Sequence, residues 1–203
     1  MILKSYIVEN NKDQLFKYRF FLFYGENIGL KKILKDYIKE KNEASETINL
    51  FQDEINKDSK KLERHLFNTS LFEDKKTIII HNATDKILEI IENLDDIDES
   101  IKIVLVSDIL DKRSKLRSFF EKKTELAIVA CYKDTEITLR NYISSELKGF
   151  KGLDHEAIKM IINSSNLERE KALSAINKIK VLFKSKNIIL EKLYELLDIN
   201  SNS

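Results

Sequence analysis

The residues that most suggest chemistry lie in the stretch FFLFYGENIGLKKIL, positions 20–34. An apolar run ends at Tyr24, a loop containing Gly25 and Gly29 follows, and a lysine-rich helical pattern comes next. A buried strand, a glycine loop and a helix N-terminus together form the arrangement that binds phosphate groups through backbone amides. A nucleotide site is therefore the first hypothesis that the sequence raises.

The details of this loop depart from those of a working phosphate-binding loop. The motif G-x-x-x-x-G-K-[ST] places a lysine on the outer phosphates and a hydroxyl on magnesium. Here Gly29 comes one residue early and is followed by Leu30, and Lys32 stands after Lys31 where Ser or Thr is needed. We interpret Gly25, Gly29 and Lys31 as a degenerate loop, whose glycines allow a tight strand-to-helix turn without a ligand.

The next candidate for nucleotide chemistry is the end of the apolar run TIIIH (77–81). In a hydrolysing nucleotide domain, a strand at this point ends in carboxylates that bind magnesium and activate water. Here the chain reads HNATD, so the first carboxylate is Asp85, four residues after His81. With two phosphate-handling elements altered, we expect no catalytic residue and no bound cofactor.

Other polar residues give weaker signals. Ser107 and Asp108 end another apolar run, where they either contact a ligand or, as we favour, cap the following turn. The histidines and the single cysteine show no metal-ligand spacing: His65, His81, His155 and Cys131. We therefore predict no metal site, and we interpret Cys131 as a buried strand residue in a reducing compartment.

The elements that position these residues are five short apolar runs separated by helical patterns. The runs are FFLFY (20–24), TINLF (47–51), TIIIH (77–81), IKIVLV (101–106) and LAIVACY (126–132). Their length and their richness in Ile, Val and Phe indicate strands buried on both faces. Strand alternating with helix predicts a three-layer, P-loop-type α/β domain with a five-stranded, mainly parallel sheet over residues 1–134.

Only helical patterns follow this domain, over residues 135–203. The apolar residues that mark four helices are Ile137, Ile143 and Leu147; Ile158, Ile161 and Ile162; Leu173, Ile176, Ile179 and Phe183; and Leu190, Leu193, Leu196 and Leu197. The sequence thus predicts a small all-α domain, a helical lid on the α/β domain.

Composition limits the classes of partner. A net charge of +1 gives no broad electrostatic attraction to DNA or to anionic lipid, although a local patch remains open. No apolar run reaches 18 residues, and the N-terminus has no signal-peptide pattern. We expect a cytoplasmic protein without membrane contact.

Four longer segments resemble a known family: LFNTSLFEDKKTIII, IVLVSDILDKRSKLRSFFEKKTELAIVACYKD, NLEREKALSAINKIKVLF and NIILEKLYELL. Together they are similar to the delta subunit of the bacterial DNA polymerase III clamp loader. The resemblance implies an AAA+-like fold with a degenerate nucleotide site, and a non-catalytic place in the polymerase (nucleotidyltransferase) holoenzyme. It also implies a function in DNA replication: binding and opening the sliding clamp for loading on primed DNA, without ATP hydrolysis by this chain.

The implied partners are the sliding clamp (beta subunit), the other clamp-loader subunits and, through the complex, primed DNA. The family's clamp-contacting pair corresponds to Leu71 and Phe72, with Thr69 and Ser70 alongside. This pair precedes the strand expected at 77–81, so it lies at the sheet edge opposite the nucleotide edge. If both side chains face solvent, a partner's pocket suits them; the alternative is that both belong to the core.

Lys112 and Arg113 match a further family pattern, and we consider them for contact with DNA or another subunit. Family members usually continue into a third helical collar domain, which we expect to be absent here, because the chain either is a fragment or lacks that assembly surface.

Two other functions stay open. One is an ATP-hydrolysing AAA+ subunit or small P-loop NTPase; the other is a stand-alone DNA-binding module using Lys112, Arg113, Lys115, Arg117, Lys122 and Lys123, unless that cluster is an ordinary solvated helix face.

Overall fold

The computed structural model describes residues 2–44, 46–58, 60–67, 75–94 and 97–198. The chain forms two compact units. The α/β unit consists of Met1–Glu26 and Lys31–Tyr132, and the helical unit of Asn27–Leu30 and Lys133–Ser203. The helix that follows the glycine loop therefore begins in the helical unit and continues in the α/β unit.

The α/β unit contains a six-stranded sheet in which every neighbouring pair is parallel. The strands are β1 (Ile2–Leu3), β2 (Phe20–Tyr24), β3 (Glu46–Phe51), β4 (Lys76–His81), β5 (Ile101–Ser107) and β6 (Leu126–Ala130), in the spatial order β1-β6-β2-β5-β4-β3. The predicted α/β fold with its parallel sheet is confirmed, and all five apolar runs form strands. The additional strand β1 pairs with β6 at the edge of the sheet.

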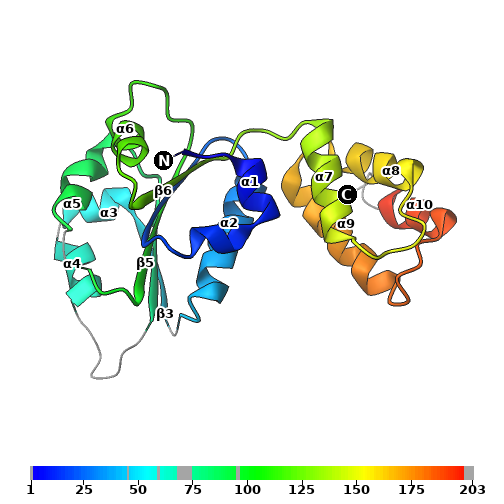
Figure 1. Ribbon diagram of the computed structural model, residues 1–203, viewed down its shortest axis with the longest axis horizontal. Helices are drawn as coiled ribbons and strands as arrows, with labels where there is room; N and C mark the ends of the chain where they lie inside the picture. Colours follow the sequence, from blue (N-terminus) through cyan, green and yellow to red (C-terminus); the bar gives the residue numbers. More distant parts are fainter. Residues whose placement is uncertain (1, 45, 59, 68–74, 95–96, 199–203) are drawn as a thin grey trace. The chain divides into compact units, whose positions relative to one another are not determined.

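Helices cover both faces of this sheet (Figure 1). The helical segments are α1 (Ser5–Asn10), η1 (Lys12–Leu15), α2 (Ile28–Lys41), α3 (Gln52–Lys57), α4 (Lys60–Phe67), η2 (Asp85–Ile87), α5 (Leu88–Glu92) and α6 (Lys115–Lys122). Figure 1 shows α2 on one face and α4, α5 and α6 on the other. This distribution follows from the strand order, because right-handed crossovers that run in opposite directions along the sheet place their helices on opposite faces. The connection from β2 to β3, with α2, runs one way, and those from β3 to β4, β4 to β5 and β5 to β6 run the other way.

Strands β2, β4, β5 and β6 are buried along nearly their whole length, as their continuous apolar runs predict. The prediction was wrong for β3 at the sheet edge, where buried Ile48 and Leu50 flank the exposed Asn49. In β2, four of the five residues are buried, and β4 is buried from Lys76 to Ile80. One face of the sheet packs its alternate residues, including Leu22 and Ile80, into a core with Leu116 and Phe120 of α6. The sheet therefore fixes where each strand ends, and with it the carboxyl edge that would hold a nucleotide.

The helical unit consists of α7 (Glu136–Glu146), α8 (His155–Ser165), α9 (Arg169–Leu182) and α10 (Leu190–Asp198), together with residues 27–30. Its core contains Ile143, Ile161, Ile176 and Leu193. Ile137, which we placed with Ile143 as a marker of its helix, is 71% exposed. Six residues correspond to about 600° of helical rotation, so the two side chains point about 120° apart.

Among the described residues, no helix is both long enough and apolar enough to span a membrane. Within the same residues, no group of three or more His, Cys, Asp or Glu side chains is placed to hold a metal ion.

Candidate functional site

The loop after β2 closes on the backbone of the neighbouring strand ends. Gly25 has φ +120° and donates its N–H to the carbonyl of Asp108 over 3.1 Å. A Cβ atom at Gly25 would stand 2.3 Å from the carbonyl oxygen of Cys131, whose own N–H donates to Tyr24 O over 2.6 Å. This turn thus requires glycine for its left-handed backbone and for the close approach of residue 131, with no ligand involved.

Lys31, the candidate phosphate-binding lysine, is turned onto the protein itself. Its Nζ donates to the carbonyl oxygen of Ser107 over 2.9 Å and lies 3.7 Å from Oδ1 of Asp108. The lysine side chain is 7% exposed, whereas that of Asp108 is 98% exposed. The carbonyl is therefore the main partner, because an ion pair with a fully solvated carboxylate contributes little.

Ser107 takes neither of the roles that we predicted for it. Its hydroxyl is buried and donates to the carbonyl of Ala83, and the N–H of Ala83 donates to Val106 O over 2.9 Å. These bonds join the residues that follow β4 to the end of β5. Ser107 therefore connects two strand ends, and it neither caps the next turn nor faces an open site.

The residue at the end of β4 is a packed histidine. The Nε2 atom of His81 lies 3.1 Å from Oδ1 of Asn49, and its ring centroid lies 5.2 Å from that of Phe51. Burial, with a smaller contribution from the positive charge of Lys35, lowers the pKa of His81 below its usual value. This shift favours the neutral imidazole, at a position where a hydrolysing site would have a carboxylate.

Asp85, the first carboxylate after β4, is engaged at the N-terminus of α6. Its Oδ1 accepts the hydroxyl of Ser114 over 2.6 Å and the N–H of Leu116 over 2.9 Å. Burial opposes ionisation, but the hydrogen bonds from Ser114, Leu116 and Lys115 outweigh it, and the pKa of Asp85 lies below its usual value. This carboxylate stabilises the start of α6, as anions do at a helix N-terminus, and its oxygen Oδ1 is already engaged by protein donors.

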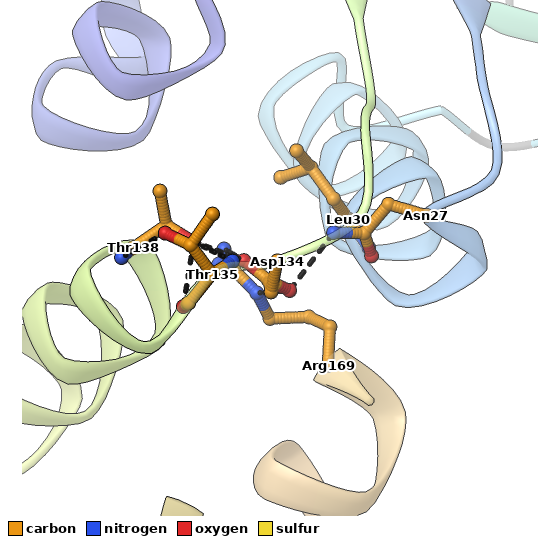
Figure 2. Close-up of polar contacts among 6 residues, drawn as sticks. All are labelled: Asn27, Leu30, Asp134, Thr135, Thr138 and Arg169. Carbon is orange, nitrogen blue, oxygen red and sulfur yellow. Dashed lines mark hydrogen bonds and ion pairs between the residues drawn. The ribbon is translucent and has the colours of Figure 1, made fainter. Parts of the chain in front are cut away.

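The helical unit contains a buried polar cluster that no motif in the sequence indicates (Figure 2). Both side-chain nitrogens of Arg169 that face Asp134 donate to its carboxylate, Nε to Oδ2 over 2.8 Å and Nη2 to Oδ1. Thr138 donates its hydroxyl to Oδ1 over 2.8 Å, and Nδ2 of Asn27 donates to Oδ2 over 2.9 Å. The side chains of Arg169 and Asp134 are 1% and 2% exposed, so the ion pair is shielded from water.

Electrostatics in this cluster keep Asp134 ionised. Burial would raise the pKa of Asp134, but the hydrogen bonds and positive charge of Arg169 lower it, and the hydrogen bonds from Asn27 and Thr138 lower it further. Together they hold the pKa below its usual value. The guanidinium of Arg169 also lies 4.2 Å from the ring centroid of Tyr142. The pair is thus supported on several sides, as a buried ion pair must be to offset its desolvation.

Gly29 has a packing role in the same unit. A Cβ atom at Gly29 would stand 2.7 Å from Cβ of Arg169 and 2.8 Å from the backbone nitrogen of Glu170. The first turn of α2 and the start of α9 therefore touch at a point where only glycine fits. The two glycines of the loop thus serve different contacts, Gly25 with residue 131 and Gly29 with residues 169 and 170.

The residues predicted to contact a sliding clamp, Thr69, Ser70, Leu71 and Phe72, lie outside the described residues. Lys112 and Arg113 are exposed in the turn between β5 and α6. The wider basic cluster is not one uniform face. Arg117 is half-buried, pairs with Glu121 and lies 5.2 Å from the ring centroid of Tyr24.

Comparison by sequence finds no match, either with a family model or with a curated protein. Among solved structures, the fold is similar to that of the Bacillus subtilis DNA clamp loader delta protein, with a TM-score of 0.62 and 14% sequence identity. The match covers 95% of this chain and 61% of that chain, so this chain spans less than two thirds of the matched protein. At this identity, the likeness establishes a shared, clamp-loader-like fold.

Proposed function

We propose that this chain is a clamp-loader subunit of the delta type, which binds a sliding clamp and opens it for loading on primed DNA. The observation that carries the proposal is the closed carboxyl edge of a sheet whose fold is shared with a clamp loader delta protein. Gly25 and Lys31 bond to the protein's own carbonyls, and the carboxylate nearest to β4 is bound at α6. A subunit with this edge acts through partner binding and not through hydrolysis.

In this proposal the α/β unit is an AAA+-like domain with a degenerate nucleotide site, and the helical unit is its lid, with the domain boundary near residue 134. The partners are the sliding clamp, the other subunits of the loader and, through the assembled complex, primed DNA. Lys112 and Arg113 are exposed between β5 and α6 and are available for contact with DNA or a neighbouring subunit.

Leu71 and Phe72 are the proposed anchors on the clamp. Burying a Leu or Phe side chain contributes about 1.5–3 kcal/mol. The pair therefore accounts for about 3–6 kcal/mol, or roughly a hundredfold to ten-thousandfold in affinity. A clamp interface that exchanges between closed and open forms shifts toward opening by no more than the difference in the subunit's affinity for the two forms.

Surface plasmon resonance on the immobilised cognate clamp tests this proposal with the double variant Leu71→Ala/Phe72→Ala. We expect clamp binding to fall by at least about a hundredfold while the thermal unfolding midpoint stays within about 2 °C. Tyr194→Ala is the control, because it removes an exposed aromatic side chain in α10 of the helical unit, and clamp binding should not change. A large loss of thermal stability in the double variant would place the pair in the core and contradict the proposal.

Calorimetry with ATP and magnesium tests the nucleotide part separately. We expect no binding to the wild-type chain, because Lys31 and the Gly25 amide already have protein partners. Micromolar binding that disappears in Lys31→Ala would support an ATP-hydrolysing subunit instead.

A further inference from the structure

The carboxylate of Asp134 has a complete set of donors. It accepts four hydrogen bonds, from Nε and Nη2 of Arg169, Nδ2 of Asn27 and Oγ1 of Thr138. An ionised carboxylate has about four lone-pair positions, so this set leaves no acceptor unmet. With a side chain only 2% exposed, Asp134 behaves as a bound anion inside the protein.

This internal anion lies at the N-terminal turn of α2, a helix of fourteen residues. Asn27 joins the two: its Oδ1 accepts the N–H of Leu30 over 2.9 Å, and its Nδ2 donates to Asp134 over 2.9 Å. Figure 2 shows Asn27, Asp134 and Arg169 converging at this turn. The start of a helix favours negative charge through its unpaired amides and its dipole, and a phosphate group is its usual external ligand.

The donors around Asp134 are also those that suit a phosphate group. The planar fork of Arg169 fits two oxygens of either a carboxylate or a phosphate, and the amide and hydroxyl of Asn27 and Thr138 serve either anion. We propose that Asp134 is a built-in substitute for a phosphate ligand, which occupies the anion position at the N-terminus of α2 and closes it to phosphate compounds from solution.

Charge balance makes the proposal testable. The guanidinium of Arg169 is 1% exposed and cannot lose its proton, so it requires an anion as long as the chain is folded. Removing the carboxylate of Asp134 leaves that requirement in place and leaves space beside it. An oxyanion from solution should then bind to the folded chain and stabilise it in proportion to its concentration.

The experiment is thermal unfolding of the full chain and of Asp134→Ala, titrated with inorganic phosphate and, at equal ionic strength, with chloride. For Asp134→Ala we expect a saturable rise of the unfolding midpoint with phosphate, at low-millimolar affinity, and little change with chloride. For the wild-type chain we expect only the small, non-saturating advantage of phosphate over chloride that exclusion from the protein surface gives to folded proteins in general. A phosphate response of equal size in the wild-type chain, or none beyond chloride in the variant, would overturn the proposal.

Two further variants separate a specific site from a general salt effect. Asp134→Ala/Arg169→Met removes the guanidinium as well and should lose the phosphate response. Asp85→Ala removes another carboxylate at a helix N-terminus, at α6, where the observed partners are Ser114 and the Leu116 amide with no guanidinium. Phosphate should not rescue it, and an equal response in Asp85→Ala would assign the effect to helix ends in general and overturn the proposal.

If Asp134→Ala is unfolded without added anion, far-ultraviolet circular dichroism follows the same titration, and phosphate but not chloride should restore the helical signal. Asp134→Ser, which leaves a smaller space, is the second variant. If neither substitution responds to phosphate more than to chloride, the proposal fails. The titration contains no clamp, so its result is independent of whether the chain binds one.

Discussion

At the carboxyl edge of the sheet, Gly25 and Lys31 bond to backbone carbonyls of residues 108 and 107, whereas in the helical unit Asp134 is held by the side chains of Arg169, Asn27 and Thr138. The contacts of Gly25 and Lys31, the backbone set, depend on the path of the backbone, and their carbonyl acceptors do not titrate. The contacts of Asp134, the charged set, depend on two opposite charges that water does not reach. The difference shows that one chain can satisfy polar groups near a helix start either by backbone shape or by charge, and each is vulnerable to a different change.

The largest expected effect is on the charged set. Arg169→Met removes the guanidinium and leaves the carboxylate of Asp134 buried, which should cost about 3–5 kcal/mol of the free energy of unfolding. Lys171→Met is the matched control on the same helix, because it breaks the exposed pair with Glu168 and should cost less than about 1 kcal/mol. Chemical denaturation measures both, and equal costs would show that the buried pair is not special.

The backbone set is broken by Gly25→Ala. The substitution forces a side chain into φ +120° and against the carbonyl oxygen of Cys131. An unfavourable backbone conformation alone costs about 1–3 kcal/mol of the free energy of unfolding, and Gly25→Ala should cost more than this. Gly149→Ala is the control, because Gly149 has φ +87° and no atom lies within 4 Å of a Cβ added there. This variant should show only the cost of the backbone conformation. A Gly25→Ala variant as stable as Gly149→Ala would mean that residue 131 moves away easily.

A smaller effect is expected for Lys31→Met, which removes the hydrogen bond to Ser107 O but keeps an unbranched apolar chain in its place. The loss should be about 1–2 kcal/mol, because one buried carbonyl loses its partner while no buried charge is left behind. Urea unfolding measures it beside Arg169→Met. If the two losses were equal, the contrast between backbone and charge would be wrong.

The smallest effect concerns the pH dependence of stability, which should change in variants of Asp134 but not in variants of Lys31. Because the folded-state pKa of Asp134 is lowered, its stabilisation is complete above the unfolded-state aspartate value of about 3.9 and is lost as pH falls through the lower, folded-state pKa. Denaturant unfolding at a series of pH values should show a weaker acid dependence in Asp134→Asn than in the wild-type chain. Lys31→Met should keep the wild-type dependence, and unchanged curves for Asp134→Asn would argue against an ionised, paired Asp134.

The sequence predicted those features that repeat locally. Continuous apolar runs located five strands, and the run FFLFY coincides with β2 at both ends. The two-residue strand β1 carries too few residues for a pattern, and its pairing with β6 depends on a contact across more than a hundred residues. Helix α1 was missed because its single buried residue, Val8, leaves no apolar periodicity to detect.

The buried cluster of the helical unit was missed for a different reason. Its ion pair joins residues 35 apart in the sequence, and Asn27 joins Asp134 across 107 residues, so no spacing rule connects them. Two local signals were present: Asn27 before an amphipathic helix, and Thr135 with Thr138 in the pattern of a capping box. They indicate where helices begin, but not that the two starts share one carboxylate.

The separation of Asn27 from Asp134 also sets a timetable for synthesis. The 107 residues between them take about 5–20 s to add at roughly 5–20 residues per second. Throughout that interval the carboxylate of Asp134 does not yet exist, so the opening turn of α2 is translated well before the partner that Nδ2 of Asn27 binds in the folded chain.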